Sequence, residues 1–145
     1  MSRLCDGYSG SIAIPPSTHE VSKAMNKPVK IPGPDHPITV TKTPARVVVK
    51  AGGKIIGDSR NALTLKEGSY PAVQYIPRVD VDMTQLRRTE HTTYCPYKGD
   101  ASYYSLPNAE NAVWTYETPH PAMAAIKDHL AFYPDRVDSI EVSDT

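Results

Sequence analysis

The sequence predicts an all-β domain, and two observations support this prediction. From Ile38 onward, short runs of β-branched, aliphatic and aromatic residues recur about every eight to twelve positions, separated by turn-forming residues. Few segments show the longer apolar period of a helix, and regular short strands are typical of a sandwich or a barrel-like sheet. At 145 residues the chain is long enough for one domain with a modest core.

The first 35 residues form a proline-rich N-terminal extension, and a single domain is predicted over 36–145. Only residues 20–26 have the composition of a short helical segment. Helices and central strands are interrupted by Pro15, Pro16, Pro28, Pro32, Pro34 and Pro37. We expect the extension to be partly wrapped on the domain and partly mobile, with few functional residues, although a proline-rich arm can close over a site. A lid, an oligomer contact and a simple tether all remain open for it.

The first half of the domain reads as strands joined by turns. Strands are predicted over 38–41, 45–50 and 54–57, with Ala51-Gly52-Gly53 as a hairpin turn. Residues 61–67 alternate as a strand or form a brief helical turn, and 72–76 is a strand that Pro77 ends.

The second half begins with a capped turn and one turn of helix over 80–86, with Asp80 or Asp82 as the cap. A hairpin follows over about 89–105, around the turn 95–100. Three further strands are predicted over 111–116, 129–133 and 137–142, and the best helix candidate, with proline at its first position, is 121–127.

Composition excludes several classes of function. Sixteen basic and sixteen acidic residues give no net charge, so no electrostatic footprint points to nucleic acid or to an anionic membrane. No apolar run has the length of a membrane span, and the N-terminus lacks an apolar signal region, so we expect a cytoplasmic protein. Nucleotide-binding glycine loops and common hydrolase or metalloprotease motifs are absent from the sequence, and no cofactor is expected.

The two cysteines, Cys5 and Cys95, form no CxxC pair and no zinc-spaced cluster with histidine, so no metal site is expected. In a reducing compartment we do not expect a structural disulfide. Cys95 is then a free thiol, either buried and inert or exposed and reactive.

The segment His91–Tyr104 concentrates chemistry that an ordinary hairpin does not need. Its fourteen residues include one imidazole, one thiol, one amine, one carboxylate and four phenols. Lys98 would lower the pKa of the Cys95 thiol by proximity, and His91 suits general acid–base work because imidazole titrates near neutrality. The alternative is that the aromatic rings only cover a sheet while the polar groups lie in water.

A second group surrounds Tyr75. Arg78 and Asp80 follow this strand into a loop, where they either pair with each other or contact a ligand, and Glu67 is placed to reach the same region. The chain has nine tyrosines and one phenylalanine, although a plain core favours rings without a hydroxyl. This excess favours a ligand cleft over an exposed sheet face.

Several motifs closely resemble the family known as domain of unknown function 427. They are Arg46-Val-Val-Val49, Asp58-Ser-Arg60, Tyr75-Ile-Pro-Arg-Val-Asp80, Thr93-Tyr-Cys-Pro-Tyr-Lys-Gly-Asp-Ala-Ser-Tyr103, Asn111-Ala-Val-Trp-Thr-Tyr116 and Ala131-Phe-Tyr-Pro134. The resemblance covers roughly residues 36–142. It implies a β-tent, two antiparallel sheets packed at an angle, with one or two short helices and a concave site between the sheets.

Some relatives with this architecture bind zinc through two CxxC pairs, which this sequence lacks. A nucleotidyltransferase-like label attached to the family finds no phosphate loop or metal-binding acidic pair here. By resemblance, the concave site would be lined by Arg46, Glu67, Tyr75, Asp80, His91, Cys95, Lys98, Tyr103, Trp114 and Tyr116.

The leading hypothesis is a small-molecule-binding domain that acts as a cofactor-independent acid–base enzyme, an isomerase, cyclase or hydrolase of an organic metabolite. Its catalytic residues would be His91, Lys98, Tyr75 and Asp80. Substrate would be bound by Arg46, Glu67, Arg78, Cys95, Tyr103, Trp114 and Tyr116.

Two alternatives remain. One is a non-catalytic module that binds a ligand or a protein. The other is a structural role for the motif, in which Lys98 pairs with Asp100 and Cys95 is simply buried. The sequence leaves open whether the protein is a homo-oligomer.

Overall fold

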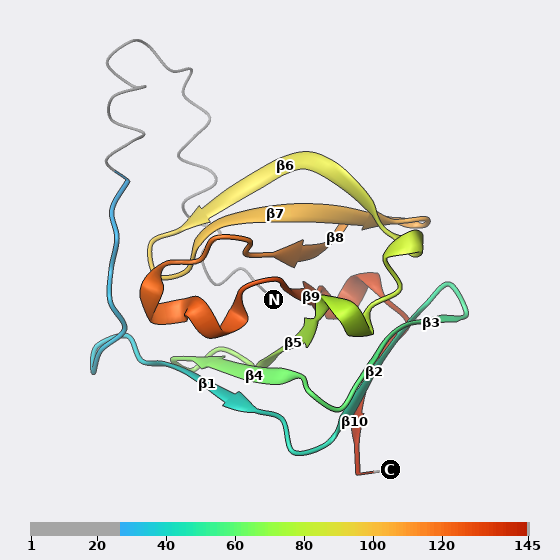
Figure 1. The fold of residues 1–145 in the computed structure, drawn as a ribbon, viewed down its shortest axis with the longest axis horizontal. Helices are drawn as coiled ribbons and strands as arrows, with labels where there is room; N and C mark the ends of the chain where they lie inside the picture. The colour runs from blue at the N-terminus through green and yellow to red at the C-terminus, as the bar shows by residue number, and fades with distance from the viewer. Residues whose placement is uncertain (1–26, 145) are drawn as a thin grey trace.

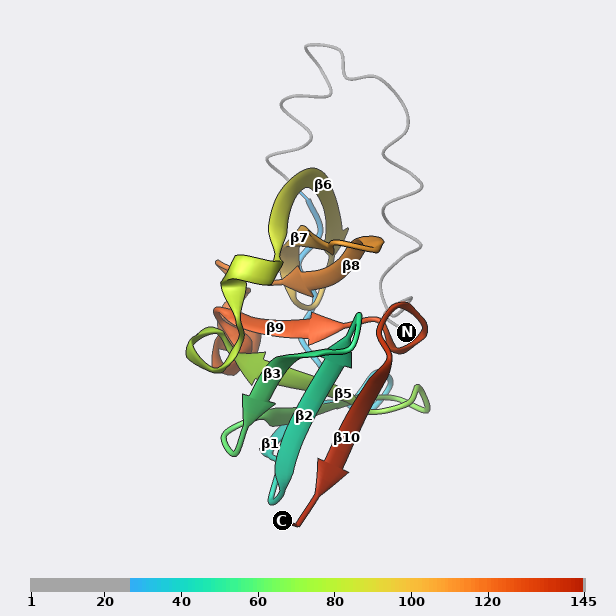
Figure 2. The ribbon, with the colours of Figure 1, turned by 90° about the vertical axis from the view of Figure 1, so that its right-hand side faces the viewer.

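A computed structural model describes residues 27–144 and shows an all-β fold of two antiparallel sheets (Figure 1). The large sheet has the order β1 (Ile38–Lys42), β4 (Leu63–Glu67), β5 (Val73–Pro77), β9 (His129–Phe132), β8 (Ala109–Thr115), β7 (Gly99–Leu106) and β6 (Arg87–Cys95). The small sheet has the order β10 (Ser139–Ser143), β2 (Arg46–Ala51) and β3 (Lys54–Ser59). Figure 2 shows the small sheet crossing in front of the large one, so the predicted fold class is confirmed. Expectations for residues 1–26 lie outside the described residues.

Alternation along the strands of the large sheet divides the interior into two cores. One face, with Tyr104, Val113 and Phe132 in register on neighbouring strands, packs against the small sheet. The other face carries the row Tyr103, Trp114 and Ala131. We call the first the inter-sheet core: Val47, Val49, Ile56, Ala62, Ile76, Val81, Tyr104, Leu106, Ala112, Val113, Leu130 and Phe132. We call the second the aromatic core: Leu65, Tyr75, Cys95, Ala101, Tyr103, Trp114, Tyr116, Met123, Ile126 and Ala131.

Strand β4 settles the ambiguity left for residues 61–67. It pairs with β1 as a strand, so the helical alternative is wrong. Leu65 lies in the aromatic core, and Glu67 is two residues further along the same face. Alternation therefore carries a carboxylate into the interior at the end of this strand.

The helical segments of residues 27–144 are short 3-10 turns: η3 (Arg78–Asp80), η4 (Met83–Gln85), η5 (Pro121–Ile126) and η6 (Pro134–Arg136). Of the two residues predicted as the cap, Asp82 is the one that caps η4: its side chain accepts a hydrogen bond from the Thr84 amide. The helix expected over 121–127 is η5, interrupted at Met123 by a non-helical backbone. Met123 and Ile126 are its buried residues, and both belong to the aromatic core.

The β6–β7 hairpin, predicted over 89–105, forms between Arg87 and Leu106. Its register places Tyr94 opposite Asp100, and a bulge interrupts the ladder between Arg88 and Thr92. His91 lies inside that bulge, so it has no directly paired residue on β7.

The Arg88–Glu117 ion pair fastens this hairpin to the segment that follows β8. Arg88 Nη1 lies 2.8 Å from Glu117 Oε2, and Nη2 lies 3.0 Å from Oε1. Arg88 holds the pKa of the Glu117 carboxyl below its usual value, chiefly by this hydrogen bonding. A depressed folded-state pKa stabilises the fold above the unfolded pKa, and that contribution is lost as pH falls through the folded pKa.

Glu117→Gln should therefore lower the free energy of unfolding by about 0.5–1 kcal/mol at neutral pH, the range for a well-formed but partly exposed pair. The difference from wild type should shrink in acid, where the wild-type carboxyl is protonated as well. Urea unfolding at both pH values measures it, with Glu90→Gln as the control because Glu90 is exposed and has no ion pair within residues 27–144. If Glu117→Gln lowered the free energy of unfolding equally at neutral and at acidic pH, the stabilisation could not come from the ionised Glu117 carboxylate paired with Arg88.

Candidate functional site

Residues 27–37, which we call the N-terminal strap, cross the open side of the aromatic core. At one end the Lys30 amide donates to the Pro96 carbonyl, at 2.9 Å, beside the β6–β7 turn. At the other end the Gly68 amide donates to the Pro37 carbonyl, also at 2.9 Å, just after β4. Figure 1 shows this blue segment running from the hairpin to β1. The strap therefore connects the two ends of the large sheet.

A buried ion pair lies beneath the strap. Lys98, in the β6–β7 turn, places its Nζ 2.6 Å from Oε1 of Glu67 at the end of β4, and both side chains are 1% exposed. In the sheet order these elements belong to opposite ends of the large sheet. Burial lowers the pKa of the Lys98 amine, and the Glu67 carboxylate opposes this by favouring the ammonium form.

His36 extends this pair toward the surface. Its Nε2 lies 2.5 Å from Oε2 of Glu67, and its side chain is 33% exposed. The imidazole stacks on Tyr97, with ring centroids 4.1 Å apart and planes 7° from parallel. The series His36–Glu67–Lys98 thus joins a solvent-accessible imidazole to a buried amine through the two oxygens of one carboxylate.

Aromatic side chains form the wall on the inner side of this series. Trp114 Nε1 donates to the Tyr75 hydroxyl at 3.2 Å, and the two rings meet edge to face. Burial raises the pKa of the Tyr75 hydroxyl and of the Tyr116 hydroxyl, so both phenols stay protonated over the physiological range. Tyr103 hydrogen-bonds through its hydroxyl to Thr93 Oγ1 at 2.9 Å.

The structure brings seven of the predicted site residues together. Glu67 and Lys98 form the ion pair, and the other five belong to the aromatic core: Tyr75, Cys95, Tyr103, Trp114 and Tyr116. His91 is exposed, and its ring packs at 4.5 Å on the outer side of Tyr103.

Three predicted residues lie elsewhere. Arg46 forms a two-bond ion pair with Asp58 across β2 and β3. Asp80 accepts a hydrogen bond from Ser59, also in β3, at 2.6 Å. Arg78 donates to the hydroxyl of Tyr104, at 3.2 Å, in the inter-sheet core. None of these three contacts involves a residue of the aromatic core.

Two expectations about the hairpin are wrong. Lys98 does not pair with Asp100: Asp100 binds Lys27 of the strap at 2.8 Å, and Lys98 binds Glu67. Lys98 points into the aromatic core while Asp100 is exposed, so they face different surroundings. Cys95 is buried and disulfide-bonded rather than a free thiol, and the second cysteine, Cys5, lies outside the described residues.

His36 is the residue that the sequence did not single out. It lies next to the proposed boundary of the extension, outside every recognised motif. Ile38 pairs directly with Glu67, which brings His36 near that carboxylate, but this register follows from β1–β4 pairing and not from local sequence. The only feature of the sequence that could have pointed to His36 is its position as an isolated histidine just before the first strand.

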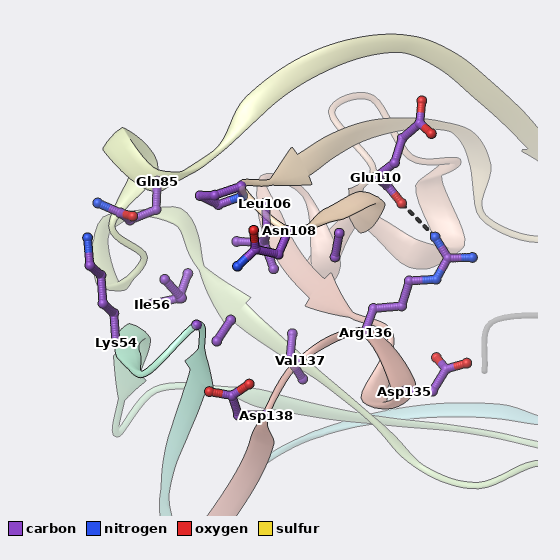
Figure 3. A pocket seen from close by; sticks show the side chains of 14 residues that line it. Lys54, Ile56, Gln85, Leu106, Asn108, Glu110, Asp135, Arg136, Val137 and Asp138 are labelled. Carbon is purple, nitrogen blue, oxygen red and sulfur yellow. Dashed lines mark hydrogen bonds between the residues drawn. The ribbon is translucent and has the colours of Figure 1, made fainter.

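A cavity of about 700 Å³ lies at the other end of the molecule, between the β2–β3 and β7–β8 turns (Figure 3). A concave site between the sheets was expected. None of the residues predicted to line it is among those that line this cavity. The motif residues instead pack the opposite face of the large sheet or fasten strands to one another.

No group of three or more His, Cys, Asp or Glu side chains within residues 27–144 is arranged to hold a metal ion. In the same range, none of the helices has the length and apolar character that crossing a membrane requires.

A family model described as a domain of unknown function, DUF427, matches residues 39–143. The chain is a DUF427 protein. No curated protein matches the chain. The match includes Glu67 and Lys98 but begins after His36, so this DUF427 protein adds an imidazole from outside the matched region to a buried pair within it.

Proposed function

We propose that this DUF427 protein binds a small organic molecule and transforms it by general acid–base chemistry at the His36–Glu67–Lys98 series. The main observation behind this proposal is the buried ion pair. An amine and a carboxylate, each 1% exposed, lie 2.6 Å apart beside the aromatic core. Groups buried with a specific charged partner are concentrated at functional sites.

The arrangement supports proton transfer in both directions. Transfer of a proton from Lys98 to Glu67 leaves a neutral amine, which can accept a proton from an acidic C–H or O–H of a substrate. Glu67 can pass the proton to His36, which exchanges protons with solvent because a third of its side chain is exposed. The protonated Lys98 can then return a proton, so an isomerisation, cyclisation or hydrolysis needs no cofactor.

The aromatic walls favour an apolar organic substrate. Trp114, Tyr103 and Tyr116 present large ring surfaces, and their burial makes this region poorly hydrated. The Tyr103 hydroxyl offers a polar contact that can orient such a substrate.

Substrate access would require the N-terminal strap to move. The strap is fastened by backbone hydrogen bonds at its ends, the exposed Lys27–Asp100 ion pair and the His36 contacts with Glu67 and Tyr97. The hairpin end is also held by the Tyr94 hydroxyl, which donates to the Pro28 carbonyl at 2.5 Å. The exposed ion pair contributes only about 0–1 kcal/mol, so release of this end costs mainly the Tyr94–Pro28 and Lys30–Pro96 hydrogen bonds. Lifting the strap would uncover Tyr97 and the buried pair while leaving the sheet intact.

The test begins with a thermal-shift screen of metabolites and of aromatic or terpenoid compounds, since a ligand of the folded state raises the melting temperature. Turnover of a hit is then compared in wild type, His36→Gln and His91→Gln. We expect His36→Gln to reduce kcat by about 10²–10⁴-fold, the usual contribution of a general acid–base group, with binding retained.

His91→Gln is the matched imidazole control, because it changes an exposed ring outside the series. Loss of turnover in His91→Gln alone would assign the acid–base role to His91, as the sequence predicted. Full turnover in both variants and in Lys98→Arg would contradict the mechanism.

A non-catalytic binding module is the second candidate. The observation that favours it is the aromatic packing around Trp114, whose ring contacts the buried Tyr75 on one side and the partly buried Tyr133 on another. Ligand affinity should then depend on Trp114 and Tyr103 and should be indifferent to His36 and His91. Unchanged affinity after substitution of both aromatic residues would exclude it.

A further inference from the structure

The cavity between the β2–β3 and β7–β8 turns has no part in the proposed acid–base chemistry. Its volume of about 700 Å³ falls within the range of small-molecule pockets. Figure 3 shows the two turns and the segment 135–138 facing one another around it. Its lining shares no residue with the Lys98 region, so it is a separate candidate site.

The floor of the cavity is apolar. Ile56 and Leu106 are members of the inter-sheet core, and Ala51, Ala109 and Val137 pack against that core while only partly buried. The apolar interior therefore reaches solvent at this opening. A ligand with an apolar body would cover this surface and gain the corresponding hydrophobic free energy.

The rim carries charges of both signs. Lys54 has no ion pair within residues 27–144, and Arg136 is held by a 2.6 Å hydrogen bond to the Glu110 carbonyl and by the face of Tyr133. Within residues 27–144, Asp138 accepts one side-chain hydrogen bond, from the Gly53 amide at 2.9 Å, through one of its two oxygens. Both cations and the second Asp138 oxygen can therefore bind a ligand.

Two amide side chains complete the rim. Gln85 and Asn108 make no side-chain hydrogen bond within the described part of the chain, and each offers a donor and an acceptor. In Figure 3, Gln85 lies near Lys54 at one end of the cavity, Asn108 lies over its centre, and Arg136 lies at the other end.

We propose that this cavity binds a zwitterionic molecule with an apolar body, of the size of a short peptide. A purely anionic ligand would meet three carboxylates, those of Glu110, Asp135 and Asp138. A purely cationic ligand would meet Lys54 and Arg136, and a polyol would leave the apolar floor uncovered. A carboxylate at a cation of the rim and an ammonium group at Asp138 satisfy both charges at once.

The test is an NMR titration of the full ¹⁵N-labelled chain with L-leucyl-L-leucine. The matched probe is N-acetyl-L-leucyl-L-leucinamide, which keeps the apolar body and lacks both charges. We expect the backbone amides of Gly52, Gly53, Lys54 and Asn108 to shift with the free dipeptide. The uncharged probe should bind about tenfold more weakly, equivalent to about 1.4 kcal/mol.

Lys54→Gln and Asp138→Asn should each weaken binding of the dipeptide several-fold, and Asp138→Asn keeps an acceptor for the Gly53 amide. Lys42→Gln is the control, because Lys42 is exposed on β1 away from the cavity. Equal binding of the two probes, or no shift of the cavity amides up to about 10 mM dipeptide, would overturn the proposal. Neither result bears on the Lys98 region, which the His36 and His91 variants test separately.

Discussion

Lys98→Met is expected to lower the free energy of unfolding by about 3–5 kcal/mol, because it leaves the Glu67 carboxylate buried without its main partner. Glu67 is 1% exposed, so water cannot replace the lost ammonium group without structural change. The contact of His36 with the other carboxylate oxygen remains in this variant and offsets part of the loss. Urea unfolding measures the change, and the single tryptophan, Trp114, provides the fluorescence signal.

The control is the double variant Lys98→Met/Glu67→Leu, which replaces both charges with apolar side chains of similar size. Apolar replacement of a complete buried ion pair is often neutral or stabilising, so the double variant should be more stable than Lys98→Met. Additive losses from Lys98→Met and Glu67→Leu in the double variant would show that the two residues do not form an energetic pair.

Trp114→Ala is expected to cost about 3–5 kcal/mol, the range for removing a large aromatic side chain from a packed core. The indole is 2% exposed and contacts Tyr75 and Tyr133. Trp114→Phe keeps a ring but removes the Nε1 donor, which leaves the buried Tyr75 hydroxyl without that hydrogen bond, at a cost of about 1–3 kcal/mol.

Tyr75→Phe supplies the matched control. In the double variant Trp114→Phe/Tyr75→Phe both polar groups are absent, so the loss should be smaller than the sum of the two single losses. Circular dichroism follows unfolding in all three variants, because the two that replace Trp114 have lost the fluorescence signal. Strict additivity would mean that the 3.2 Å hydrogen bond contributes nothing measurable.

Local patterns were sufficient for most of the fold. The alternation in β4 predicts which face carries Leu65, and the turn residues at 51–53 and 95–100 mark the hairpins that form there. The 3-10 character of η5 was not foreseen, because its backbone is set by burying Met123 and Ile126 in the aromatic core. Tertiary packing overrides local preference in such short segments.

The site was only partly predictable, because it depends on the order of strands. Glu67 and Lys98 meet through the sequence of pairings β4–β5–β9–β8–β7, and no local signal encodes that β5 pairs with β9. Sequence motifs identified Glu67 and Lys98, but they also placed Arg46 and Asp80 in the same site. In the structure these two residues bind Asp58 and Ser59 of β3, away from the Lys98–Glu67 pair. His36 was missed because its importance depends entirely on the register of β1 against β4.

The position of the Lys98–Glu67 contact has a consequence for folding kinetics. Its two residues come from opposite ends of the large sheet, so they meet only after the intervening strands have paired. Removing the two charges from water is therefore favourable only late in folding. The contact is therefore expected to be absent from the folding transition state and to act mainly as a barrier to unfolding. A charged pair that contributes little to folding speed can in this way lengthen the lifetime of the native protein.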